Sequence, residues 1–334
     1  MTTTLSTSLR LLTLAGFSSL CAQQAYALRA ETALDFLSPL SAGSYSWIRP
    51  TSTVTFDSTP SVWSQAGGFD VIDNAGAATT TSYQSQARAV ANYTQLSVQA
   101  RIMVDNPMTA GSANLPYADA NGIPIAGGVP MGYASRASAS LGDIVTLGTS
   151  AGTAAASLRF ELGIDGTLGV DFHGDQYSSV EGSLWQVNQY DSANWGATLA
   201  WDSQQSSFDP STWLFTHGTK TIDRAVWSKP IPVVNGKADF SFELMAHAEV
   251  NFAQSYINGG SYEAWADLGS TLRLVRAHAF DAMGNEIGLD SLVGNSGTHY
   301  AVSSVPEPGS WQLLLLGVLP ILLRQSRKRP MARL

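Results

Sequence analysis

The stretch ADFSFELMAHAEV, from Ala238 to Val250, decides the fold class. Its even-numbered positions are all apolar, and its odd-numbered positions are mostly polar. A period of two is the pattern of a β-strand with one buried and one solvated face. The stretch therefore predicts a long strand of an antiparallel sheet, with Glu243, His247 and Glu249 on the solvated face.

The same alternation recurs in other parts of the chain. It is clear over Leu158–Ile164, after which Asp165 and Gly166 predict a tight hairpin turn. Further strands are predicted over Gln95–Val104, Ser140–Leu147, Leu184–Val187, Thr198–Trp201 and Leu268–Phe280, the last ending in a turn at 281–285. Only Glu31–Leu37 suggests a short helical turn. Strands at such intervals predict an all-β fold, an antiparallel β-sandwich of jelly-roll type, with a barrel or a β-solenoid as alternatives.

Composition indicates a folded, acidic body. The 334 residues are 44% hydrophobic, which is enough for a sizeable core, and only 13% are charged. Residues 28–304 carry 12 basic and 25 acidic side chains, a formal charge of −13. Such a body should repel nucleic acid and anionic lipid. It could attract Ca²⁺, for which charge alone is a weak argument, and no other cofactor is expected.

Residues 1–27 have the three parts of a signal peptide. Arg10 precedes an apolar stretch, and Ala25 and Ala27 form an A-x-A cleavage site. We therefore expect export through the Sec translocon and cleavage by signal peptidase after Ala27. Because the only cysteine, Cys21, lies in the removed segment, the mature chain would contain no disulfide and no cysteine-based metal site.

The C-terminal end combines three elements. Pro306, Glu307 and Pro308 precede an apolar segment at 309–323, which is followed by a basic cluster and a tail at 330–334. The cluster consists of Arg324, Arg327, Lys328 and Arg329. Clustered cations stay on the cytoplasmic side of a membrane, so the body would face outward. A transmembrane helix of this length reaches only ~22 Å against a hydrocarbon core of ~30 Å, which suits transient insertion better than permanent anchoring.

Residues 305–329 resemble the PEP-CTERM sorting signal of Gram-negative bacteria that make extracellular polysaccharide. The resemblance implies that Pro306, Glu307 and Pro308 are recognised by an exosortase, a membrane cysteine protease. It also implies that the protein passes through the inner membrane to the cell surface or the extracellular matrix. An ordinary tail anchor is the alternative. The body, residues 28–304, resembles such proteins only loosely; we take it as one domain, with an N-terminal lobe at 28–130 as an alternative.

The body contains no recognisable catalytic motif. Neither a G-x-S-x-G elbow nor an H-E-x-x-H metal site occurs, so we do not expect an enzyme. Asp171, His173 and Asp175 alternate along the chain and are weak candidates for a metal site, although no EF-hand pattern is present. An ordinary polar loop is the alternative.

Tryptophans offer the remaining indication of function. Five lie between positions 185 and 227, interleaved with Asn and Gln. Because a pyranose has an apolar face and a polar rim, aromatic rings beside amides are typical of sugar-binding surfaces. The candidates are Trp185, Trp195, Trp201 and Trp213, with burial in the core as the alternative. We predict a non-catalytic structural or adhesive protein of exopolysaccharide or biofilm, and sugar binding by these tryptophans is the more specific hypothesis within that prediction; the alternative is a secreted polysaccharide hydrolase or lyase.

Overall fold

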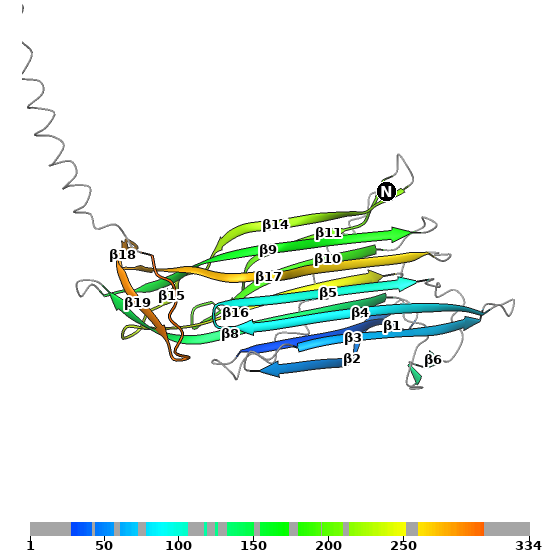
Figure 1. Cartoon of the computed structure of the whole chain (residues 1–334), viewed down its shortest axis with the longest axis horizontal. Helices are drawn as coiled ribbons and strands as arrows, with labels where there is room; N and C mark the ends of the chain where they lie inside the picture. Colours follow the sequence, from blue (N-terminus) through cyan, green and yellow to red (C-terminus); the bar gives the residue numbers. More distant parts are fainter. Residues whose placement is uncertain are drawn as a thin grey trace, which may run out of the picture.

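Two antiparallel β-sheets packed face to face make up the body (Figure 1). The computed structural model describes residues 28–41, 44–56, 61–72, 78–105, 117–118, 124–125, 132–149, 154–173, 180–194, 196–209, 214–251 and 260–303. Within these ranges most residues lie in strands, the rest form turns, bends or irregular segments, and no helix is present. The prediction of an all-β sandwich is therefore confirmed.

The first sheet has the strand order β11-β10-β16-β8-β1-β2, with β19 also pairing with β8. Its strands are β1 (Arg29–Ser41), β2 (Ser44–Phe56), β8 (Gly132–Thr149), β10 (Val180–Tyr190), β11 (Ala197–Gln205), β16 (Lys237–Asn251) and β19 (Leu289–Gly294). The stretch that decided the fold class is β16, which lies between β10 and β8.

The second sheet has the order β14-β9-β17-β5-β4-β3, with β15 pairing with β9 and β18 with β17. Its strands are β3 (Ser61–Ile72), β4 (Ala78–Asn92), β5 (Gln95–Asp105), β9 (Ser157–His173), β14 (Gly218–Trp227), β15 (Ile231–Pro232), β17 (Ser261–Phe280) and β18 (Glu286–Ile287). Two short pairs complete the described strands: β6 (Tyr117–Ala118) with β7 (Pro124–Ile125), and β12 (Ser207–Asp209) with β13 (Leu214–Thr216).

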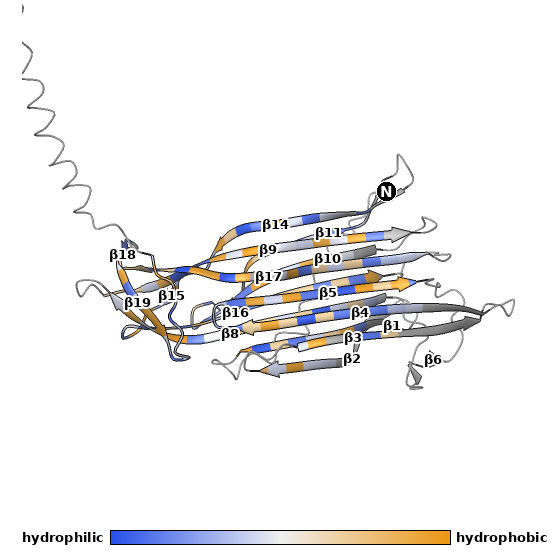
Figure 2. Cartoon of the chain, viewed as in Figure 1, coloured by the Kyte–Doolittle hydropathy of each residue, from blue (hydrophilic) through white to orange (hydrophobic). Residues whose placement is uncertain are grey.

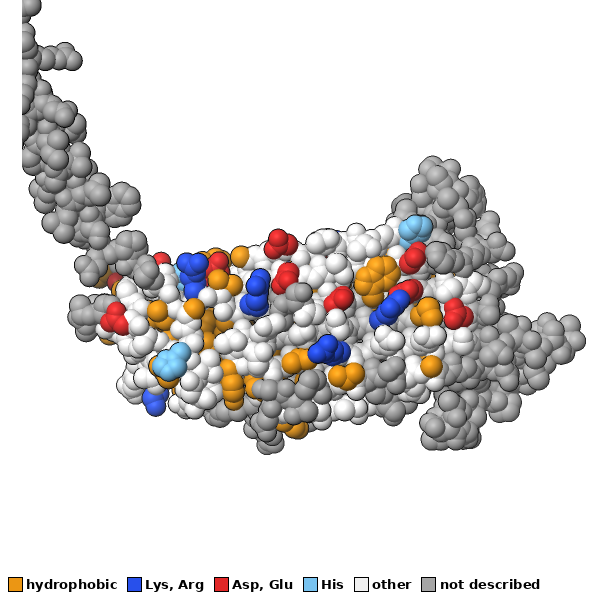
Figure 3. Space-filling view, viewed as in Figure 1, with side chains coloured by type: hydrophobic (Ala, Val, Ile, Leu, Met, Phe, Trp, Pro, Cys, Tyr) orange, Lys and Arg blue, Asp and Glu red, His pale blue; other side chains and the backbone are white. Residues whose placement is uncertain are grey.

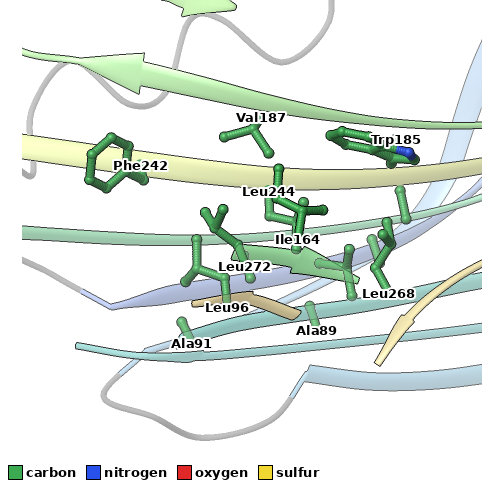
Figure 4. Packing of buried hydrophobic residues seen from close by; sticks show 14 of the residues in the cluster. Ala89, Ala91, Leu96, Ile164, Trp185, Val187, Phe242, Leu244, Leu268 and Leu272 are labelled. Carbon is green, nitrogen blue, oxygen red and sulfur yellow. The ribbon is translucent and has the colours of Figure 1, made fainter. Parts of the chain in front are cut away.

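Alternating residues of both sheets form one core. Phe240, Phe242 and Leu244 of β16 are fully buried, and the apolar residues alternate with polar ones along the strands (Figure 2). Figure 4 shows side chains of the first sheet, such as Val187 and Leu244, pointing toward Ile164 and other side chains of the second. Burying these apolar faces is the main driving force that holds the two sheets together.

Two local predictions are wrong. Residues 31–37 lie in β1 and form no helical turn. Asp165 and Gly166 form no hairpin either, because β9 runs straight through them and pairs there with both β14 and β17. Gly166 has a different role: β17 bulges opposite it, and a Cβ on Gly166 would lie 2.5 Å from the Asp267 carbonyl oxygen. The glycine permits close backbone approach at a bulge.

The other predicted strands are confirmed and are longer than expected. Those at 95–104, 140–147, 184–187 and 198–201 lie within β5, β8, β10 and β11. The segment 28–105 contributes strands to both sheets, since β1 pairs with β8 and β5 pairs with β17.

The segment from β19 to Ser303 closes one end of the sandwich. β19 pairs with β8 of the first sheet, and Val302 then bridges to Ala277 of the second. Tyr300 is buried between Phe160 and Phe240, which come from opposite sheets, and its hydroxyl donates a 2.9 Å hydrogen bond to Asp143. Ser296 donates a second hydrogen bond, of 2.6 Å, to the same carboxylate.

The predicted terminal signals lie outside the described residues. These are the cleavage site at Ala25 and Ala27, the Pro306–Pro308 motif, the apolar segment at 309–323 and the basic cluster. Among the residues that the structure describes, no helix is long and apolar enough to span a membrane.

Candidate functional site

An open hollow of about 600 Å³ lies on the outer face of the second sheet. Its walls come from β3, β4, β5, β9 and β17, and Trp265 of β17 lies among them. Figure 3 looks onto this face, where acidic, basic and apolar side chains are interspersed. A polar face is what alternation predicts for the outside of a sandwich, so an aromatic ring there is notable.

Trp265 lies across the neighbouring strand, β9. It pairs in register with Gly169, and a Cβ on Gly169 would overlap ring atoms Cζ2 and Cε2 of Trp265. The ring therefore occupies the space that a side chain at position 169 would fill. Glycine here allows the indole to rest on the β9 backbone, where Trp265 is half-buried and lines the hollow.

A polar rim surrounds the ring. On one side of Trp265 along β17, Glu263 pairs with Arg101 of β5. On the other side Asp267 accepts a hydrogen bond of 2.9 Å from Gln99. The rim is thus held by hydrogen bonds and ion pairs between neighbouring strands. We call Trp265, Gly169, Arg101, Glu263, Gln99 and Asp267 the Trp265 platform.

The chemistry of the platform suits a flat, amphipathic ligand. The indole offers an apolar face, while carboxylate, amide and guanidinium groups offer both donors and acceptors at its edge. The Arg101 side chain is 56% exposed, so part of its guanidinium faces solvent. A hexopyranose, whose apolar C–H face is ringed by hydroxyls, has the complementary chemistry.

The predicted tryptophans do not form one site in the described residues. Trp185 is fully buried in the core, which supports the core alternative for that residue. Trp201 is 51% exposed but lies on the outer face of the first sheet, opposite Gln186 in register. Trp195 and Trp213 lie outside the described residues.

Sequence reasoning missed Trp265, although a signal was present. Around it Tyr262, Ala264, Ala266 and Leu268 alternate and are buried, which places Trp265 in the polar phase of the strand. A tryptophan at one of the outward-facing positions of an alternating strand indicates an aromatic ring on the protein surface. Its glycine partner, about a hundred residues away in sequence, could not be identified without the register.

The weak metal candidates are not brought together. Asp171 is partly buried near the end of β9 and pairs in register with Glu263, only the backbone of His173 is described, and Asp175 lies outside the described residues. Across the described ranges, no group of three or more His, Cys, Asp or Glu side chains could hold a metal ion.

The expectation of a solvated face on β16 is wrong. Glu243, His247 and Glu249 are all more than nine-tenths buried. Glu243 accepts a hydrogen bond of 2.8 Å from the Tyr190 hydroxyl, and His247 Nε2 lies 2.8 Å from Glu249. Burial is the main reason that the pKa of Glu243 lies above its ordinary value. Hydrogen bonds and ion pairs allow such polar groups to be buried.

Fold and site together define the protein as a two-layer antiparallel β-sandwich with an aromatic platform on one outer face. No protein-family model matches the chain, and no curated protein is detectably similar to it.

Proposed function

We propose that this chain is an exported protein of the cell surface or extracellular matrix that binds polysaccharide without cleaving it. The observation that carries the proposal is the indole of Trp265, which rests on Gly169 within a polar rim. Surface aromatic rings beside hydrogen-bonding groups suit a sugar, because stacking and directional hydrogen bonds act together. The protein would contribute to the organisation of exopolysaccharide or to adhesion.

The sequence of the two ends supports the proposed location. A signal peptide at 1–27 would direct the chain to the Sec translocon, and the motif at 306–308 would direct it to an exosortase after transient insertion in the inner membrane. The described body ends at Ser303, only a few residues before that motif.

Substitution of Trp265 tests the binding proposal. A panel of neutral and acidic polysaccharides is screened by affinity gel electrophoresis with residues 28–303. Trp265→Ala should weaken binding to the retained polysaccharide by about tenfold or more, because aromatic anchors dominate binding energy.

Trp201→Ala is the matched control, since it removes an exposed tryptophan from the opposite sheet. It should bind as the wild type does. Binding that Trp265→Ala leaves unchanged, or no retention by any polysaccharide, would contradict the proposed site.

The termini of the native protein test the proposed sorting. Mass spectrometry of protein from the cell envelope and the medium should find Leu28 at the N-terminus and a C-terminus near Pro306–Pro308. A surface-associated form that still ends in Arg333 and Leu334 would instead identify the tail as an anchor.

A polysaccharide hydrolase or lyase is the second candidate. Asp171 and Glu263 are direct neighbours in register on the same face, and carboxyl groups of retaining glycosidases lie ~5 Å apart. Release of new reducing ends from the retained polysaccharide, abolished by Glu263→Gln, would favour this candidate over simple binding.

A further inference from the structure

A second tryptophan lies across the same strand as Trp265. Trp227, the last residue of β14, is 43% exposed and pairs in register with Glu161 of β9. Its ring centroid is 4.7 Å from that of His278, which belongs to β17 on the far side of β9. To reach His278 from β14, the indole must extend over β9.

Neighbouring side chains hold the Trp227 ring in place. The Arg159 guanidinium carbon lies 5.4 Å from the ring centroid, a distance at which cation and ring attract each other. His278 is buried, and its Nδ1 lies 2.7 Å from Glu286 Oε1. Arg159 also donates a hydrogen bond of 3.0 Å to the Ser228 carbonyl. Trp227 is therefore a partly exposed ring held by Arg159 and His278, much as the Trp265 ring is held against Gly169.

The two rings mark the ends of one stretch of β9. Gly169 under Trp265 and Glu161 beside Trp227 are eight residues apart, which is about 26 Å along a strand. Between them the outward positions of β9 carry Thr167, Asp165 and Gly163, whose partners on β14 are Thr221, Asp223 and Ala225. The outward side chains of β9 between the two rings are thus short, and Arg273 and Val275 of β17 lie beside Gly163.

Polar groups are available midway. Arg273 of β17 reaches 3.9 Å from Asp165, and its side chain is 61% exposed. Next to it Val275, 38% exposed, packs against Gly163. A ligand lying along β9 would meet an indole, then hydroxyl, carboxylate and guanidinium groups, and then a second indole.

We propose that Trp265 and Trp227 are the two ends of one binding trough along β9, which takes an extended polysaccharide chain rather than a short oligosaccharide. This inference rests on the proposed function and names its ligand class as a polymer long enough to span both rings. Once one ring holds the chain, binding at the other becomes intramolecular, so affinity rises without any new kind of contact.

The test compares ligand lengths. The probes are the polysaccharide retained in the panel and its own hydrolysis fragments, separated into disaccharides or trisaccharides and into chains longer than ~26 Å. Trp227→Ala should weaken binding of the long chains about tenfold or more. For the short fragments, Trp227→Ala should lower only the number of sites or leave binding unchanged, whereas Trp265→Ala should weaken binding at every length.

Controls distinguish failure of the trough along β9 from failure of the Trp265 platform. Trp227→Phe keeps an aromatic ring and should restore most of the long-chain affinity, while circular dichroism verifies the fold of each variant. Equal long-chain affinity of Trp227→Ala and wild type, with Trp265→Ala still impaired, overturns the trough but leaves the platform. If neither Trp227→Ala nor Trp265→Ala changes binding, both the trough and the proposed binding site on the Trp265 platform are overturned.

Discussion

At the residue scale, Tyr300 links the two sheets at the closed end of the sandwich. It contacts Phe160 and Phe240, and its hydroxyl donates a hydrogen bond to Asp143, which is itself buried. A hydrogen bond to a charged group contributes about 1.5–3 kcal/mol. Tyr300→Phe should therefore lower the free energy of unfolding by about 2 kcal/mol, measured by urea denaturation at pH 7. Unchanged stability would mean that Ser296 alone satisfies Asp143.

The same substitution should change the response to alkaline pH. Burial, and secondly the Asp143 carboxylate, raise the pKa of Tyr300 above its ordinary value of 10.0. The unfolded chain therefore releases this proton at lower pH than the folded one, so stability is fully present below about pH 10 and is lost as pH rises beyond it. Tyr300→Phe should lose less stability than wild type between pH 9 and 11. Tyr133, whose pKa is also raised, contributes equally to both proteins. If the free energy of unfolding falls equally with rising pH in Tyr300→Phe and in the wild type, this account is contradicted.

At the scale of the element, the contact of the Trp265 ring with the β9 backbone depends on Gly169. Gly169→Ala would place a methyl group where the Trp265 indole lies, so the ring must leave the β9 backbone. We expect polysaccharide binding to fall by about tenfold, with an unchanged circular dichroism spectrum and a loss of stability of about 1–3 kcal/mol from overpacking. Gly218→Ala, on neighbouring β14, is the control, since its Cβ would meet only Gln204 at 3.8 Å. Wild-type binding by Gly169→Ala would show that the ring's position is unimportant.

Alternation alone predicted the strands β5, β8, β9, β10, β11, β16 and β17, since period-two burial is a local property, but it did not predict β1 to β4 or β14. Prediction from sequence was wrong at Asp165 and Gly166, because a glycine can mark either a hairpin turn or a close approach of two strands. Asp-Gly is a strong hairpin signal, but Gly166 faces a bulge in a strand about a hundred residues later. The burial of Glu243 on β16 was also unpredictable, because its hydrogen-bond partners Tyr190 and Asn188 lie on β10, more than fifty residues earlier in the chain. The platform likewise depends on registers between strands that are distant in sequence.

At the scale of the whole molecule, the sandwich keeps binding and stability on separate faces. Its core draws on both sheets, whereas the proposed trough would use only outward positions of the second sheet. On one side, charged groups also link the edges of the two sheets: Lys220 lies 2.6 Å from Asp202, and Arg224 donates to the Trp201 carbonyl. Charged edges of this kind discourage unwanted pairing with other strands.

The place of β17 in the second sheet limits how early in synthesis that sheet can be completed. β17 lies between β9 and β5, and the contact of Gln99 with Asp267 joins residues 168 positions apart. A chain that emerges N-terminus first must therefore hold β3–β4–β5 and β9–β14 as separate, incomplete pieces until β17 arrives. Such non-local closure is slow, on the order of milliseconds to seconds. During that wait apolar strand faces are exposed to solvent, and this is the interval in which a chaperone would protect the nascent protein.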